Sequence, residues 1–243
     1  MLLAVDIGNT SVKMAVFEAD ALLERFVSDK KTVLPAFLQI FQKYPGVAHT
    51  ILTSVGKEDD NLLVFLKSKT QVTQVNHRTK FPFINNYATP HTLGTDRMVL
   101  AAGAVLSHPA QNRLVIDAGT CITYDFVDAD NAYAGGAISP GIRLRYESMH
   151  NFTAKLPLLY AEVPQGYIGN TTAGSMHSGV INGVVFEIEG FVKEYAQQYQ
   201  QVTVILTGGD AEFLAKRLKS TIFANSNFLL QSLNLLYLYT NQK

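Results

Sequence analysis

An Asp-x-Gly pattern occurs twice in this chain, and the repeat limits the possible folds more than any other feature of the sequence. Apolar residues lead into Asp6 and Asp117, a glycine follows two positions later at Gly8 and Gly119, and apolar and polar residues then alternate. Alternation puts successive side chains on opposite faces of a strand, and glycine allows a tight turn. Each copy therefore predicts a β-hairpin. Its apolar face carries Val12, Met14 and Val16 in the first copy, and Ile122, Tyr124 and Phe126 in the second.

The spacing of the two copies indicates two related domains. The aspartates stand 111 positions apart (117 minus 6), close to half of the 243-residue chain. A motif repeated at half the chain length is typical of two similar domains that face each other. We expect these domains at residues 1–112 and 113–243. Either turn alone is more simply an ordinary hairpin turn, because Asp, Asn and Gly favour turns. The pair favours a second interpretation, in which the backbone N–H groups of the turns bind phosphate.

The remaining pattern predicts layered α/β domains, with the order βββαβαβ in the first half. Residues 77–93 show no periodicity and predict a long loop. Glycines interrupt the helix predicted at 170–200. Each interior glycine destabilises a helix by about 0.8–1 kcal/mol relative to alanine. Because close approach of another backbone would justify this cost, we expect such an approach there. Further strands are expected at 22–28, 50–55, 71–75, 132–139 and 202–206, and further helices at 32–44, 58–69, 98–106, 142–153, 212–219 and 229–239.

Composition excludes several classes of function. Lys plus Arg and Asp plus Glu number 20 each, so the chain lacks the basic surface of a nucleic-acid binder. Cys121 is the only cysteine, so the chain can form no internal disulfide, which fits a reducing compartment. We expect Cys121 to be a small packing residue. The early Asp6 argues against a signal peptide, and no apolar run is long enough for a membrane span. We expect a soluble cytoplasmic protein. The 6 histidines are scattered and show no zinc-ligand spacing.

The two turns together could hold a nucleoside triphosphate from two sides. The aspartates would repel phosphate, so they would act through a metal ion, its waters or a monovalent cation. Gly208 and Gly209 offer bare backbone that an adenine ring could approach. Neither a P-loop nor a Gly-x-Gly-x-x-Gly dinucleotide motif is present in the sequence. The hydroxyl and cationic groups near the turns belong to Thr10, Ser11, Lys13, Thr120 and Thr123.

Asp96 allows two interpretations. Thr95 is a good N-cap before a helical run, and Asp96 in the first turn complements the helix dipole, so the segment is compatible with a simple helix start. Gly94 and Arg97, however, place an acid and a guanidinium at a helix N-terminus after a long loop. A carboxylate there could accept a proton from a substrate hydroxyl while Arg97 holds a substrate anion. Position alone leaves both interpretations open.

Taken together, these motifs resemble the type III pantothenate kinases, of the superfamily of acetate and sugar kinases, Hsp70 and actin. The Gly-x-Asp-Arg motif lies between the two Asp turns, and a Gly-Gly-x-Ile-x-Pro-Gly segment follows them; these two are more specific than the turns themselves. The resemblance covers essentially the whole chain and implies two ribonuclease H-like (actin-like ATPase) domains with a cleft between them. The motifs are Asp6-Ile7-Gly8-Asn9-Thr10, Gly94-Thr95-Asp96-Arg97, Asp117 to Asp125, Gly135-Gly136-Ala137-Ile138-Ser139-Pro140-Gly141 and Thr207-Gly208-Gly209.

The resemblance implies that ATP, with Mg²⁺, phosphorylates pantothenate to 4'-phosphopantothenate, the first step of coenzyme A biosynthesis. It implies that Asp96 accepts the proton and that Asp117 binds a monovalent cation, K⁺ or NH₄⁺. It also implies a homodimer, with no nucleic acid or membrane partner. The alternatives are another small-molecule kinase of this superfamily or a non-catalytic regulator that retains the fold. The ATP-binding residues would be Asp6, Ile7, Gly8, Asn9, Thr10, Ser11, Val12, Lys13 and Thr120, and the pantothenate-binding residues Tyr87, Gly94, Thr95, Asp96, Arg97 and Thr172.

Overall fold

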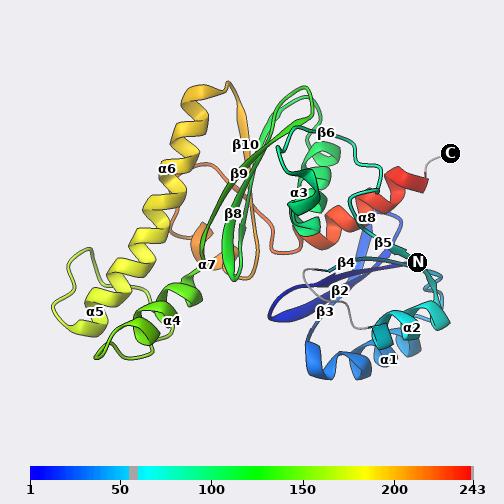
Figure 1. Ribbon diagram of the computed structural model, residues 1–243, viewed down its shortest axis with the longest axis horizontal. Coiled ribbons are helices and arrows are strands. Elements are labelled where there is room, and N and C mark those ends of the chain that lie inside the picture. The colour runs from blue at the N-terminus through cyan, green and yellow to red at the C-terminus, as the bar shows by residue number, and fades with distance from the viewer. Residues whose placement is uncertain (55–59, 242–243) are drawn as a thin grey trace. The chain divides into compact units, whose positions relative to one another are not determined.

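The structure, a computed structural model, describes residues 1–54 and 60–241 and forms two compact units (Figure 1). The first unit comprises Met1–Pro109, Asn131–Tyr133 and Asn227–Lys243, and the second comprises Ala110–Asp130 and Ala134–Ser226. The second unit thus begins at Ala110, three residues before its predicted start at residue 113. The prediction placed the C-terminal segment in the second domain, 113–243. In the structure this segment returns to the first unit, because the apolar C-terminal helix packs there.

The first unit is built on a five-stranded sheet of order β3-β2-β1-β4-β5, in which β1 runs antiparallel to β2 and parallel to β4. The order βββαβαβ predicted from the sequence is confirmed. Val55, Glu58 and Asp59 of the predicted strand and helix lie outside the described residues. The elements are β1 (Leu2–Ile7), β2 (Ser11–Glu18), β3 (Ala21–Asp29), a 3₁₀ turn (Lys30–Thr32), α1 (Val33–Lys43), β4 (His49–Ser54), α2 (Asp60–Lys69), β5 (Gln71–Gln74), β6 (Ile84–Asn85), a 3₁₀ turn (Pro90–Thr92), α3 (Thr95–Ser107) and α8 (Phe228–Asn241).

Helices cover the first sheet in two groups. The first group, α1 and α2, packs on alternate side chains of β1 and β2 to form one apolar cluster. The second, α8, packs on β1, β2 and β4 and against α3. Gly103 makes the α3–α8 contact possible, because a Cβ there would lie 1.8 Å from Ser232 Oγ. α3 is thereby held between β4 and α8, and its position is set by the core of this unit.

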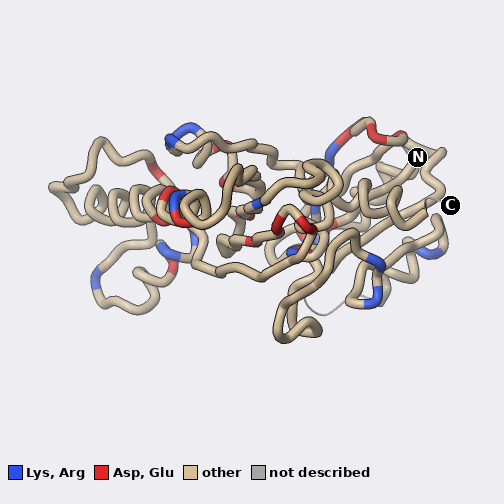
Figure 2. The backbone as a smooth tube through the Cα atoms, turned by 90° about the horizontal axis from the view of Figure 1, so that it is seen from above, with Lys and Arg blue, Asp and Glu red and all other residues tan. Residues whose placement is uncertain are grey.

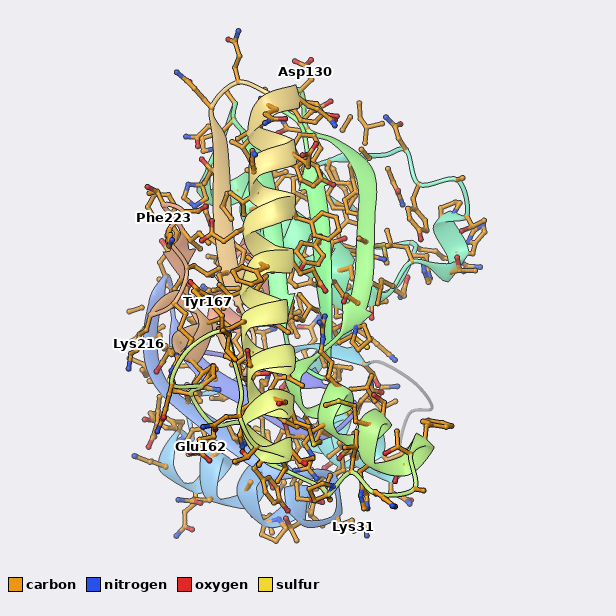
Figure 3. The ribbon with its side chains drawn as sticks, turned by 90° about the vertical axis from the view of Figure 1, so that its left-hand side faces the viewer. Lys31, Asp130, Glu162, Tyr167, Lys216 and Phe223 are labelled. Carbon is orange, nitrogen blue, oxygen red and sulfur yellow. The ribbon has the colours of Figure 1, made fainter. Side chains whose placement is uncertain are left out.

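The second unit contains most of a six-stranded sheet of order β11-β10-β7-β8-β9-β6. Residues Ala132 and Tyr133 at the start of β9 pair with β6 and belong with the first unit. Figure 3 shows α6 running along one face of this sheet, and its buried side chains join the apolar cluster there. The elements are β7 (Asn112–Ala118), β8 (Cys121–Val127), β9 (Ala132–Pro140), α4 (Ile142–Phe152), α5 (Thr172–His177), a π-helical segment (Ser178–Asn182), α6 (Gly183–Gln198), β10 (Val202–Thr207), α7 (Ala211–Ala215) and β11 (Phe223–Ala224).

Several predictions for the second half need correction. The helix expected at 170–200 is α5 and α6 joined by the π-helical segment, and the helix expected at 212–219 ends at Ala215. The sequence did not predict β11, a strand of two residues. Within this chain the expected close approach to the glycines is wrong for Gly179, Gly183 and Gly190. At each of them a Cβ would meet no described atom within 4 Å outside the helix backbone.

Lys and Arg are interspersed with Asp and Glu along the described backbone, as Figure 2 shows. Among residues 1–54 and 60–241, no helix combines the length and apolar character that a bilayer crossing requires.

Candidate active site

The first Asp-x-Gly turn joins β1 to β2 at one end of the first sheet. The Gly8 amide donates to the Ser11 carbonyl at 3.1 Å, which closes a turn with exposed residues Asn9 and Thr10. Asp6, only 4% exposed, lies opposite Lys13 on β2. The predicted hairpin is confirmed, and it places a carboxylate, a lysine and a polar turn at the same sheet edge.

The N-terminus of α3 is attached to the same edge through two threonines. Thr53 on β4 is the register neighbour of Asp6 on β1 and is fully buried. Its hydroxyl donates to Thr95 Oγ1 at 2.8 Å, and the Thr95 hydroxyl donates to the Ser54 carbonyl at 3.2 Å. The predicted Thr95 N-cap is therefore wrong: Gly94 occupies the N-cap position without a side-chain bond, because the Thr95 hydroxyl bonds β4 instead.

Asp96 lies in the first turn of α3, half-buried, with its carboxylate folded back over Gly94. A Cβ at Gly94 would lie 2.4 Å from Asp96 Oδ1, so a side chain there would displace the carboxylate. Arg97 is 6% exposed, and its guanidinium carbon lies 5.9 Å from the centre of the Tyr87 ring. The first unit thus brings together Asp6–Lys13, Gly94–Arg97 and Tyr87, all predicted as site residues.

The second Asp-x-Gly turn joins β7 to β8 in the second unit. The Gly119 amide donates to the Cys121 carbonyl at 2.9 Å, so this turn is one residue shorter than the first. Asp117 is half-buried and lies between Thr123 on β8 and Thr207 on β10. The predicted second hairpin is confirmed, and it exposes Thr120 at its tip.

Two backbone segments support this second turn. On one side Gly208 has a φ of 99°, and a Cβ there would lie 2.3 Å from the Ala118 carbonyl oxygen and 2.4 Å from Asp117 Oδ1. The Asp210 amide donates to the same Ala118 carbonyl at 3.0 Å, and burial raises the pKa of the Asp210 carboxyl. On the other side the Gly141 amide donates to the Thr120 carbonyl at 3.0 Å. The glycines therefore allow backbone to touch the turn directly.

The surroundings of Asp117 fit a hard cation held by oxygen atoms. Asp117 Oδ1 and the Ala118 carbonyl oxygen both lie within 2.4 Å of the position that a Cβ of Gly208 would take. Oxygen atoms are the donors that alkali and alkaline-earth ions prefer. Within the described part of the chain, no cluster of three or more His, Cys, Asp or Glu side chains has metal-binding geometry.

Thr172 occupies a different part of the second unit. It is exposed at the first position of α5, where the Thr171 side chain caps the helix by accepting from the Gly174 amide at 3.0 Å. A depression of about 760 Å³ contains Thr172, with α4 on one side and α5 on the other. Its walls comprise Met149, Leu156, Gly169, Asn170, Thr171, Thr172, Ser175, Met176 and Gly179.

The family model described as type III pantothenate kinase matches residues 2–194. The chain belongs to the type III pantothenate kinase family. A type III pantothenate kinase of Flavobacterium johnsoniae is 55% identical over 98% of both chains. The two Asp turns and the Gly-x-Asp-Arg helix start of this pantothenate kinase family member all lie within the matched residues.

Solved structures confirm the actin-like fold. A protein described as a Baf family transcriptional activator from Campylobacter jejuni superposes with a TM-score of 0.63, with 19% identity over 96% of both chains. A protein described as a 2-dehydro-3-deoxygalactonokinase from Sinorhizobium meliloti gives 0.59, with 12% identity over 100% of both chains. The two-domain α/β architecture that the resemblance implies is therefore the architecture of this pantothenate kinase family member.

Sequence reasoning missed several residues that hold this site together. Thr53 sits within an apolar strand pattern that gives no sign of its bond to Thr95. Glu187 and Arg145 were not predicted as site residues, yet they are bonded to each other at 2.5 Å and lie beside the Gly-Gly-x-Ile-x-Pro-Gly segment. No sequence signal reveals these long-range contacts, because each partner is distant along the chain.

Proposed function

We propose that this enzyme transfers the γ-phosphoryl group of ATP to the terminal hydroxyl of pantothenate, giving 4'-phosphopantothenate for coenzyme A biosynthesis. The observation that carries the proposal is the family match over residues 2–194. The placement of both Asp turns and of Asp96 at a helix start supports it. The relative from Flavobacterium johnsoniae is itself named a type III pantothenate kinase.

In the proposed reaction the pantothenate hydroxyl oxygen attacks the γ-phosphorus, and the bond from that phosphorus to the β–γ bridging oxygen breaks as ADP leaves. The hydroxyl proton passes to the Asp96 carboxylate. Because the transition state is loose, alignment and charge neutralisation supply most of the catalysis, and proton acceptance is secondary. Residues Asp6–Lys13 and Thr120 hold the phosphates through turn N–H groups, hydroxyls and the Lys13 ammonium.

Arg97 is proposed to bind the pantothenate carboxylate, with Tyr87, Gly94, Thr95 and Thr172 as further contacts. The Arg97 guanidinium is buried against the Tyr87 ring, which limits its freedom before any substrate arrives. A fixed, poorly hydrated guanidinium binds a carboxylate through paired hydrogen bonds at a small entropic cost.

A monovalent cation, K⁺ or NH₄⁺, is proposed at Asp117, and Mg²⁺ with the ATP phosphates. When bound, these ions supply positive charge beside the phosphates. The side chain that would hold the monovalent ion is Asp117, whose carboxylate is braced by the backbone at Gly208.

A homodimer is proposed as the functional assembly. Four apolar side chains before and on α6 are more than half exposed: Val163, Tyr167, Ile168 and Phe186. Figure 3 shows Tyr167 beside α6, where its ring stacks on Phe186 with a centroid distance of 5.7 Å. Sedimentation should give twice the chain mass for the wild type and a lower mass for Phe186→Asp. A monomeric wild type would contradict the dimer.

An acceptor panel tests the proposed substrate. The protein, ATP, Mg²⁺ and K⁺ are incubated separately with pantothenate, glucose, N-acetylmannosamine and acetate, and products are identified by mass spectrometry. We expect phosphorylation of pantothenate alone. Preferred phosphorylation of a sugar or of acetate would show another kinase of the same fold. No phosphorylation of any acceptor, with ATP still bound, would show a non-catalytic regulator.

A further inference from the structure

The Gly-Gly-x-Ile-x-Pro-Gly segment has no role in the chemistry proposed so far, although it is the most specific motif of the second half. It forms the end of β9 and the turn into α4. Gly136 lies so close to β8 that a Cβ there would be 1.5 Å from the Tyr124 carbonyl oxygen. Gly141 lies equally close to the second Asp-x-Gly turn, since its Cβ would be 2.2 Å from the Gly119 carbonyl oxygen and 2.5 Å from that of Thr120.

Glu187 on α6 anchors this segment. Its Oε1 accepts from the Tyr124 hydroxyl at 2.8 Å, and its Oε2 accepts from the Ser139 hydroxyl at 3.0 Å and from Arg145 Nη2 at 2.5 Å. One carboxylate thus joins four elements, β8, β9, α4 and α6. Both Glu187 and Arg145 are largely buried, at 24% and 21% exposed.

Arg145 extends the connection to the turn itself. Its Nε donates to the Pro140 carbonyl at 2.8 Å, and its Nη2 also donates to Ser139 Oγ at 2.9 Å. Gly141 follows Pro140 in the chain, and its backbone amide donates to the Thr120 carbonyl. A continuous path of contacts therefore runs from Glu187 through Arg145 and Pro140 to Thr120, and every member belongs to the second unit.

The charge state of the cluster is fixed at neutral pH. Burial alone would raise the pKa of Glu187, but hydrogen bonds from Arg145, Tyr124 and Ser139 outweigh it and hold this pKa below its usual value. Burial and the bond to Glu187 together raise the pKa of the Tyr124 hydroxyl, so Tyr124 remains a donor. The carboxylate accepts three hydrogen bonds at once, which a neutral amide at the same position cannot do.

We infer that Glu187, acting through Arg145, is a positioning residue that holds the Asp117–Thr120 turn in the geometry required to bind the ATP phosphates and the monovalent cation. The inference rests on the proposed function, because it assigns a purpose to that turn. Glu187 itself touches no reacting group. Displacing a catalytic element by about 1 Å can lower the rate by about 10²-fold, because phosphoryl transfer depends on alignment.

The test compares four full-length proteins: wild type, Glu187→Gln, Arg145→Lys and the control Glu194→Gln. Glu194 is exposed on the same helix. The affinity of each protein for a non-hydrolysable ATP analogue in K⁺ is measured by calorimetry. The KM values for ATP and pantothenate, kcat and Tm are measured separately. We expect Glu187→Gln to weaken analogue binding and raise the ATP KM by about tenfold, as losing an outer support of a ligand-binding group does. The pantothenate KM and the control should stay within about twofold of wild type.

Arg145→Lys separates positioning from simple stabilisation. Lysine keeps a positive charge beside Glu187, but it lacks the second N–H that holds the Pro140 carbonyl. The inference predicts that this variant also loses analogue affinity. The Arg145→Lys variant also tests the inference if Glu187→Gln does not fold. Unchanged analogue affinity in either folded variant, even with a lower Tm, would overturn the inference. If wild type and control bind the analogue but do not phosphorylate pantothenate, the proposed function fails while the positioning role is still measured by binding.

Discussion

At the scale of single residues, one substitution tests the proposal that Asp96 accepts the proton. Asp96 is half-buried at the start of α3, and its neighbour Gly94 leaves room for the carboxylate to fold back. Replacing it by asparagine preserves size and removes the proton acceptor. We expect Asp96→Asn to lower kcat by about 10²-fold while Tm stays near the wild-type value. A kcat equal to wild type would remove Asp96 from the mechanism.

Arg97 gives a second prediction at this scale, with a different kinetic signature. If its guanidinium binds the pantothenate carboxylate in the ground state and the transition state alike, Arg97→Ala raises the pantothenate KM more than it lowers kcat. The ATP KM serves as the internal control and should change little. Since Arg97 is buried against Tyr87, Arg97→Lys distinguishes lost packing from lost pairing. Normal pantothenate KM values in both variants would argue against the assigned role.

Gly208 shows how one backbone conformation supports the turn at Asp117. Its φ of 99° and the 2.3 Å approach of the Ala118 carbonyl oxygen leave no space for a side chain. Gly208→Ala should destabilise the protein by about 1–3 kcal/mol. The adjacent Gly209 has nothing within 4 Å of a Cβ, so Gly209→Ala is the matched control. Equal unfolding midpoints of the two variants in urea would contradict this interpretation.

At the scale of elements, the contact between α3 and α8 fixes the helix that carries Asp96. A Cβ at Gly103 would lie 1.8 Å from Ser232 Oγ and 3.0 Å from Ser232 Cα. Gly103→Ala should therefore cost about 1–3 kcal/mol of stability through overpacking. Ser232→Gly in the same chain should restore part of the loss. Gly190→Ala, in an uncrowded helix interior, should instead stabilise. A stabilising Gly103→Ala would contradict the packing described.

The interrupted helix α5–α6 also has an explanation at this scale. Its buried residues Met176, Val180, Val184, Ile188 and Val192 recur every fourth position. In an ideal α-helix such a spacing drifts by about 40° per step. The wider π-helical turn at Ser178–Asn182 corrects part of this drift and keeps the apolar side chains on the sheet. The sequence predicts one long helix because a period of four resembles a period of 3.6.

At the scale of the whole molecule, local patterns predicted the two hairpins, the α/β class and the Gly-x-Asp-Arg helix start. Turn chemistry and alternation are encoded within about ten residues. The supports of the site could not be predicted in this way. Thr53 meets Thr95 42 positions later, and Tyr124 meets Glu187 63 positions later. Such contacts depend on how the sheets and helices pack, which periodicity alone does not specify.

The pH dependence of stability belongs to the same scale. Although burial opposes it, hydrogen bonding holds the pKa of Glu187 and that of Glu189 below the usual 4.5. A lowered carboxyl pKa stabilises the fold fully above the unfolded-state pKa, and this contribution is lost as the pH falls through the lower folded-state value. We expect Tm to fall below about pH 4.5, and to fall less steeply in Glu187→Gln. Parallel Tm curves for wild type and variant would contradict the assignment.

The central claim is that this family member phosphorylates pantothenate with ATP. The most direct test is the initial rate of ADP release, measured with and without pantothenate, first in K⁺ and then in Na⁺ at equal ionic strength. We expect ADP release that depends on pantothenate, is fast in K⁺ and is much slower in Na⁺. No pantothenate-dependent release in K⁺ would contradict it.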